Sequence, residues 1–246
     1  MKNSKNNSFK IKSIVLALLF AGIISSCGNK SSKQETAEQT EKDKETDKHD
    51  SVDIKAPPVN MTTETDSSNS SIMWMPSDQP FSGQLKLVEG DAKKLNPTSN
   101  SDGDGSKILS LSLSGEKVLL LFDDKFENVG ANLQFKTDDF QGQVAIVHHY
   151  IDVSNYDYLS FTNSLMQLGR IENGKNNVLD KKDNKMTNEW STMRVSAAGE
   201  HYKGYLNDKL INHGHAEATA SGRVGILLDG KGKVVLKMLE VMRLSE

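Results

Sequence analysis

Apolar and polar residues alternate along most of the chain beyond residue 72, and this period of two predicts β-strands. In the stretch 142–161, GQVAIVHHYIDVSNYDYLSF, Val144, Ile146 and His148 share one parity, and a second extended run begins at Tyr156. The polar residues between the two runs are few enough for an antiparallel pair. Because such a pair leaves two unpaired edges and one apolar face, it requires further strands on both sides.

Turn residues separate further runs with the same pattern. Asn173 and Gly174 favour a two-residue hairpin turn, because both central positions of that turn need positive φ. Gly199 and the pair Asn207-Asp208 predict two more hairpins. A fourth hairpin is predicted over 229–232, where it would join strand 222–228 to strand 234–244. The other predicted strands cover 108–113, 118–122, 129–135, 165–171 and 176–179.

The region 72–246 is long enough for one domain, since about 175 residues bury about 70% of their unfolded surface. Short strands at regular spacing, few prolines and no helical period predict an all-β, two-sheet antiparallel sandwich. Met193, Val195 and Ala197 share one parity of their strand and are predicted core residues. Tyr202 and Leu206 are their expected partners on the next strand.

The N-terminus predicts export. Lysines precede an apolar run at 14–24 of about eleven residues, which is short of the roughly 18 to 20 that a transmembrane helix needs. The run ends in Ile24, Ser25, Ser26 and Cys27, which resembles the lipobox of bacterial lipoproteins. Residues 1–26 are therefore predicted to be a signal peptide, and Cys27 is predicted to be lipidated and to anchor the protein in a membrane.

The residues after Cys27 indicate which membrane holds the protein and how the domain is connected to it. Gly28 stands where an aspartate commonly signals inner-membrane retention in lipoproteins, so the outer membrane is the expected location. Cys27 is the only cysteine, so no disulfide is expected. Lys, Glu, Asp, Ser and Thr dominate up to about residue 71, and a segment with so little to bury is expected to stay disordered. Residues 27–71 are therefore predicted to be a linker.

An ordered series of short motifs carries a family resemblance. GQVAIVHHYIDVSNYDYLSF is followed by LGRIENGK, NEWSTMRVSAAGEHYKGYLNDK and GRVGILLDGKGKVVLKMLEVMRL. Their order and spacing over 117–244 resemble the concanavalin A-like, laminin G-like jelly roll. Within that superfamily, the sequence is most similar to the bacterial domains grouped with the 3-keto-disaccharide hydrolases. The resemblance implies a sandwich with one concave sheet that contacts sugars or peptides.

The resemblance also implies site residues. His149 stands where relatives often have an arginine, and Asp152, Asn155 and Tyr156 match residues that relatives usually carry. An aromatic face covers the C–H groups of a sugar, while amides and carboxylates pair with its hydroxyls. The alternative is that Asp152 and Asn155 are turn residues and that Tyr156 packs in the sheet. Trp190 with Arg170 is a second predicted ligand site, as a stacking platform with a cation over its face; the alternative for Trp190 is structural.

Metal ligands are sparse in the sequence. His148 and His149 are adjacent and point to opposite faces of a strand unless that strand bulges. His213 and His215 share a face but lack a third ligand nearby in sequence, so no metal site is predicted. The loop Asn100, Asp102, Asp104 and Gly105 resembles half of a calcium loop, but Leu111 stands where an EF-hand has its bidentate glutamate. No cofactor is expected, with calcium as the one alternative.

The sequence favours binding over catalysis. No strand face of the domain carries two acids at a spacing suited to glycoside hydrolysis, and Lys237 and Met238 stand where relatives often carry an aspartate and an asparagine. A net charge of −3 argues against nucleic acid as a partner. The leading hypothesis is a membrane-anchored, non-catalytic domain that binds a glycan or glycoconjugate. The alternatives are a hydrolase acting on a modified disaccharide and a structural envelope protein that contacts other proteins.

Overall fold

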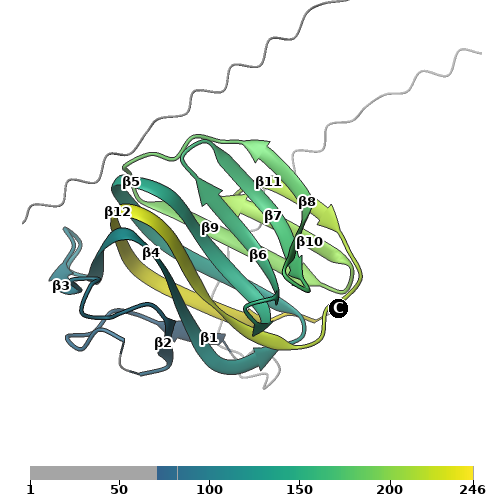
Figure 1. Ribbon diagram of the computed structural model, residues 1–246, viewed down its shortest axis with the longest axis horizontal. Helices are drawn as coiled ribbons and strands as arrows, with labels where there is room; N and C mark the ends of the chain where they lie inside the picture. Colours follow the sequence, from purple (N-terminus) through teal and green to yellow (C-terminus); the bar gives the residue numbers. More distant parts are fainter. Residues whose placement is uncertain (1–70, 82, 246) are drawn as a thin grey trace, which may run out of the picture. The chain divides into compact units, whose positions relative to one another are not determined.

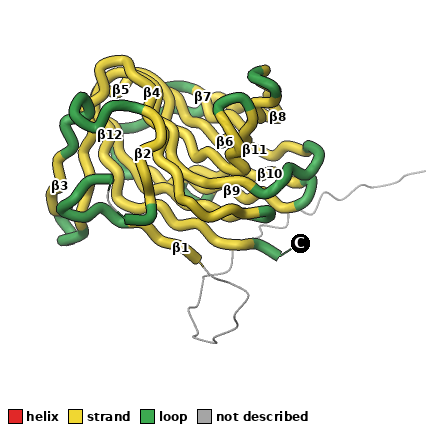
Figure 2. Tube along the Cα trace, turned by 60° about the horizontal axis from the view of Figure 1, so that its bottom comes forward, coloured by secondary structure: helices red, strands yellow, loops and turns green. Residues whose placement is uncertain are grey.

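The computed structural model describes residues 71–81 and 83–245, which consist of strands and loops (Figures 1 and 2). This part of the chain contains no helix, and hence none with the length and hydropathy to cross a membrane. The predicted signal peptide, Cys27 and almost all of the predicted linker lie outside the described residues. Nearly all of the predicted domain 72–246 lies within them.

The described part of the chain forms twelve strands joined mostly by short turns. They are β1 Ser71–Trp74, β2 Leu85–Glu89, β3 Thr98–Ser101, β4 Lys107–Phe126, β5 Val129–Asp152, β6 Asn155–Thr162, β7 Leu165–Glu172, β8 Lys175–Asp183, β9 Ser191–Ala198, β10 His201–Leu206, β11 Lys209–His215 and β12 Gly222–Arg243.

Three long strands, β4, β5 and β12, run side by side with β12 in the middle, and each passes through both layers of a sandwich (Figure 1). Sheet I contains β11, β10, β9, the first half of β5 and the second half of β12, with β1, β3 and the start of β4 along its far side. Sheet II contains β8, β7, β6, the second half of β5, the first half of β12, the end of β4 and β2. All pairs are antiparallel, which confirms the predicted all-β, two-sheet jelly-roll fold.

The long strands pass from one sheet to the other at paired glycines. Gly142 lies opposite Gly230, and a Cβ on Gly142 would stand 2.2 Å from the backbone oxygen of Asp229. Register shifts on either side of this pair bend β12 instead of reversing it. The hairpin predicted at 229–232 is therefore wrong, because β12 continues through Gly230 and Gly232 with partners on both sides.

Two other predicted boundaries merge for the same reason. The runs 108–113 and 118–122 are parts of one strand, β4, which passes through Gly115 at a φ of 117°. The runs 129–135 and 144–150 are likewise one strand, β5. A glycine between two apolar runs thus marks a bend within a strand here, because each half keeps its partners in a different sheet.

Other sequence predictions hold in the structure. Val144 pairs with Phe161 in the antiparallel unit of β5 and β6. Asn173 and Gly174 both have positive φ in the turn between β7 and β8, and Asn207 and Asp208 do so between β10 and β11. The predicted core residues of β9 are buried between the sheets, with Tyr202 buried beside them and Leu206 partly buried.

A smaller apolar cluster lies on the outer face of sheet II, opposite to the main core. Its members come from β4, β5 and β12 and are Leu119, Leu121, Ala145, Val147, Tyr150 and Leu227. Tyr156 packs against this cluster, with its ring centroid 5.9 Å from that of Tyr150 and 6.3 Å from that of Tyr158. The aromatic residue of the predicted ligand patch therefore lies at the edge of an apolar sheet face.

Candidate functional site

A β-bulge brings two adjacent histidines together. Val147 pairs with Gly225 and Tyr150 pairs with Arg223, so His148 and His149 of β5 share one position opposite β12. His149 has a φ of 49°, which carries its ring toward that of His148, and the two Nδ1 atoms are 3.1 Å apart. The expectation that these rings point to opposite faces is wrong, because the strand bulges at this pair.

A buried ion pair lies next to the histidines, between the two sheets. Asp157 of β6 shares its inward parity with Leu159 and Phe161 and pairs in register with Arg170 of β7. The Arg170 guanidinium donates from Nε to Asp157 Oδ1 at 2.6 Å and from Nη2 to Oδ2 at 3.2 Å. Arg170 and Asp157 have side-chain exposures of 14% and 1%, so this pair is largely removed from water.

A returning loop completes this polar cluster. Arg170 Nη2 also donates to the Tyr202 hydroxyl at 2.8 Å, to the Glu217 backbone oxygen at 2.9 Å and to Thr219 Oγ1. Thr219 Oγ1 in turn donates to Asp157 Oδ2 at 2.8 Å. Sheet I, sheet II and the loop before β12 are thus joined through one guanidinium and one carboxylate.

His149 takes part in hydrogen bonds through both of its ring nitrogens. Nε2 is 2.7 Å from the backbone oxygen of Glu127, and Nδ1 is 3.1 Å from Asp157 Oδ2. The Glu127 carbonyl can only accept a hydrogen bond, so Nε2 donates to it. Asp157 is therefore held by hydrogen bonds with the His149 ring and with the Arg170 guanidinium.

His148 is neutral in this setting. Burial first, and then the charges of His149 and Arg170, lower the pKa of His148 to about 3, although Asp157 acts in the opposite direction. Burial also acts to raise the pKa of Asp157, but hydrogen bonds with His149 and Arg170 and the positive charge of Arg170 outweigh it and hold that pKa well below its usual range. The cluster thus contains one anion that does not take up a proton near neutral pH.

A cavity of about 240 Å³ opens at this end of the sandwich. We call it the end cavity; its walls come from β5, β6, β7 and the loop before β12, and they consist of His149, Ile151, Asn155, Tyr156, Asp157, Arg170, Ile171, Glu172, Glu217, Ala218, Thr219 and Ala220. Four of the six ligand residues predicted from sequence, His149, Asn155, Tyr156 and Arg170, line it together.

Asp152 and Asn155 form a turn beside the end cavity. Asn155 Nδ2 donates to both carboxylate oxygens of Asp152, at 3.0 and 3.1 Å, and the Ser154 backbone N–H donates to Asp152 Oδ1 at 2.7 Å. Asn155 Oδ1 accepts from the Asn173 backbone N–H at 3.1 Å, which ties this turn to the β7–β8 turn. Asp152 is outside the cavity lining and positions Asn155, as the turn interpretation expects.

Trp190 and Arg170 do not form the predicted stacking site. Arg170 lies over the ring of Tyr202, with its guanidinium carbon 5.7 Å from the ring centroid. Trp190 instead has the ammonium groups of Lys136 and Lys237 at 5.4 and 5.2 Å from its ring. The prediction of a shared site is wrong because Arg170 faces inward and is held by Asp157.

The loop that resembles half of a calcium site binds a lysine instead. Lys237 Nζ donates to Asp102 Oδ2 at 3.0 Å and to Asp104 Oδ2 at 2.6 Å. The hydrogen bonds from Lys237 are the first cause that lowers the pKa of both carboxyl groups. The ammonium of Lys237 thus occupies the two carboxylates on which a calcium ion would depend.

Comparison with known proteins supports the fold. No protein-family model and no curated protein sequence matches the chain. A carbohydrate-binding module from Bacillus subtilis is similar with a TM-score of 0.50 and 17% identity, over 63% of this chain and 92% of that chain. The beta-glucanase of Bacillus licheniformis is similar with a TM-score of 0.50 and 14% identity, over 71% of this chain and 98% of that chain. A protein described as a native glycosidic hydrolase is similar with a TM-score of 0.52 and 12% identity, over 73% of this chain and 97% of that chain.

These similarities place the domain among the jelly-roll sandwiches that carbohydrate-binding modules and glycoside hydrolases share. Identities below one fifth establish a common fold and leave the activity to be argued from the site. The nearer relationship to the 3-keto-disaccharide hydrolases stays a prediction from the sequence motifs.

Proposed function

We propose that the protein is a membrane-anchored envelope lipoprotein whose jelly-roll domain binds a carbohydrate or glycoconjugate in the end cavity without catalysis. One observation carries this proposal. Arg170 makes its five hydrogen-bond contacts through Nε and Nη2, and Nη1 makes none within residues 71–81 and 83–245. A guanidinium that is held rigidly and keeps free donors in a cavity wall is suited to bind a hydroxyl or carboxylate of a sugar.

The remaining walls of the end cavity supply what a sugar ring needs. Tyr156 is half-buried and offers an aromatic surface, and Glu172 is exposed and offers acceptor oxygens. A volume of about 240 Å³ is below the roughly 300 Å³ at which pockets for drug-sized ligands begin, so one sugar ring or the end of a chain is the expected occupant.

The state of Asp157 supports binding without turnover. Hydrolysis by two carboxyl groups needs one that is protonated and able to give its proton to the leaving group. Asp157 is ionised, because its pKa is held well below the usual range, and Arg170, His149 and Thr219 occupy its oxygens. It therefore acts as a counter-ion that fixes Arg170.

Glycan screening of the full-length chain in detergent, with product analysis on the same samples, tests the proposal. Binding is expected without product, and Tyr156→Ala is expected to weaken it about tenfold, the loss of one stacked ring. Tyr205→Ala is the matched control, because Tyr205 of β10 is also partly buried but lies against Arg194 of β9, away from the end cavity lining. Product formation, or equal binding by the Tyr156→Ala protein, would contradict the proposal.

The anchor is tested separately. In a bacterial host, the natural chain is expected in the membrane fraction with a lipidated Cys27 at its mature N-terminus, which mass spectrometry identifies. Cys27→Ser should remove the lipid and release the protein from the membrane, since a lipid chain contributes about 0.8 kcal/mol per buried CH₂. An unmodified thiol at Cys27 in the mature protein would disprove lipidation.

A further inference from the structure

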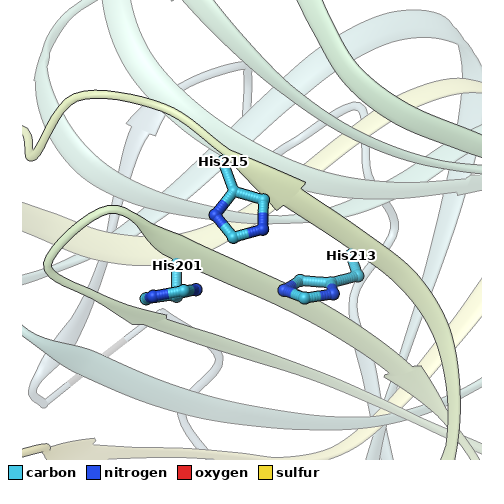
Figure 3. A group of neighbouring side chains, drawn as sticks. All are labelled: His201, His213 and His215. Carbon is cyan, nitrogen blue, oxygen red and sulfur yellow. The ribbon is translucent and has the colours of Figure 1, made fainter.

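Three histidines form a second cluster, on the outer face of sheet I (Figure 3). We call it the histidine cluster. His201 begins β10, while His213 and His215 are at the end of β11, and the register pairs His201 with His215. Tyr202 and Gly214, the next pair along this hairpin, face inward and are buried. Since side chains alternate along a strand, all three histidines must lie on the outer face.

The distances within the histidine cluster approach those of a metal site. The His215 ring centroid is 4.7 Å from that of His201 and 4.8 Å from that of His213, and one nitrogen of each ring lies within 4.8 Å of the others. Three nitrogens bound to one tetrahedral zinc at about 2.0–2.1 Å are roughly 3.3 Å apart. Small rotations of these exposed side chains supply the difference.

The rings have no competing partners. Within residues 71–81 and 83–245, the side chains of His201, His213 and His215 contact one another and take part in no hydrogen bond or ion pair. The other group of histidines, His148 and His149, is buried and engaged by Asp157. The lone pairs that a metal would bind are therefore available at the histidine cluster.

We propose that His201, His213 and His215 bind one divalent transition metal ion, with zinc as the expected ion. Imidazole nitrogen favours zinc, copper and nickel over calcium and magnesium, which prefer oxygen. Three ligands from one hairpin leave the fourth tetrahedral position open to water or to a further ligand. This site does not depend on the end cavity and adds a second binding function to the domain.

The surroundings indicate what the open position would accept. A hollow of about 510 Å³ begins beside His201 and is also lined by Ser196, Ala198, Gly199 and Lys203. Lys203 lies opposite His213 in the register and shares the outer face. Its ammonium weakens the binding of a cation modestly and attracts an anion, so a carboxylate is the class of fourth ligand that fits a metal beside a lysine.

Calorimetric titration of the full-length, metal-free chain in detergent with zinc chloride tests the site. One zinc ion per chain is expected, and calcium chloride should give no binding. His215→Gln removes the central ring and should weaken zinc binding at least tenfold, while circular dichroism shows whether the exposed substitution leaves the fold intact. His213→Gln should act in the same direction, which keeps the test valid if one variant fails to fold.

Two further variants serve as controls, because the chain has other zinc-binding side chains. His49→Gln and Cys27→Ser should both leave the zinc affinity unchanged. Cobalt(II) provides a second readout, since a tetrahedral site gives an intense visible absorption that His215→Gln should abolish. No zinc binding, unchanged affinity in His215→Gln, or loss of binding in Cys27→Ser would overturn the proposal.

Discussion

The buried His148 is expected to make the domain less stable as the pH falls from 7 to 5. Its pKa is lowered to about 3 in the folded protein, first by burial, whereas an ordinary histidine in the unfolded chain titrates near 6.5. Between these values the unfolded state binds a proton that the folded state does not bind. The stability linked to His148 is thus fully present above about pH 6.5 and is lost progressively as the pH falls toward 3.

The magnitude can be worked out from these two values. Each pH unit between the two pKa values lowers the free energy of unfolding by up to about 1.4 kcal/mol. Through His148, this free energy should therefore fall by about 2 kcal/mol between pH 7 and pH 5. Asp157 adds little in this window. Its pKa is also lowered, but its contribution is present above the ordinary carboxyl value near 3.9 and is lost only as the pH falls below that value.

Urea denaturation at pH 7, 6 and 5, followed by circular dichroism, measures the effect. His148→Gln is the informative variant, because a side-chain amide can both donate and accept a hydrogen bond in place of Nδ1, which faces His149, but does not titrate. The drop in stability between pH 7 and 5 should be smaller by about 2 kcal/mol in this variant than in the natural protein. Equal drops in the two proteins would refute the assignment of a neutral, buried His148.

Two further substitutions test the packing and the ion cluster. Gly142→Ala should destabilise the domain by about 2 kcal/mol or more in urea denaturation, because its Cβ would stand 2.2 Å from a backbone oxygen. Gly103→Ala is the control and should be nearly neutral, because its Cβ would have no atom within 4 Å. Equal stabilities of the Gly142→Ala and Gly103→Ala proteins would contradict the close backbone contact at the bend. Asp157→Asn should lower the free energy of unfolding by about 3–5 kcal/mol, because it leaves Arg170 buried without its counter-ion. The control is Asp123→Asn, at the exposed ion pair of Lys86 and Asp123, which should change that free energy by less than about 1 kcal/mol.

The alternation of apolar residues was sufficient to predict the two-layer fold. A period of two assigns one face of each strand to the core, and Met193, Val195 and Ala197 are buried as that rule requires. Asn173-Gly174 and Asn207-Asp208 form turns because few other residues tolerate the positive φ that such turns need. These are local properties, and neighbouring residues in the chain determine them.

The bends in the long strands could not be predicted in the same way. Gly230 relieves steric conflict equally in a hairpin turn and in a bulged bend, so the same residues are compatible with both. The outcome depends on β4 and β5, which keep β12 paired on both sides of Gly230. Those partners are far away in sequence, which is why the local pattern predicts a hairpin instead.

Strand parity in the sequence contains a signal for the buried pair of Asp157 and Arg170. Asp157 shares the inward parity of Leu159 and Phe161, and Arg170 shares that of Met166 and Leu168. Opposite charges at buried positions of two neighbouring strands indicate a pair that must be satisfied internally. Arg170 was among the predicted ligand residues, whereas Asp157 was not.

By itself the sequence determined which residues face the core, where the tight hairpins lie and that the fold has two β-layers, because periodicity and turn preference act over a few neighbouring residues. Only the tertiary structure decided that His148 and His149 meet at a bulge, that the loop at Thr219 closes over Arg170 and that His201 joins His213 and His215. Each of these depends on strand register and on contacts between distant segments, which a local pattern does not encode.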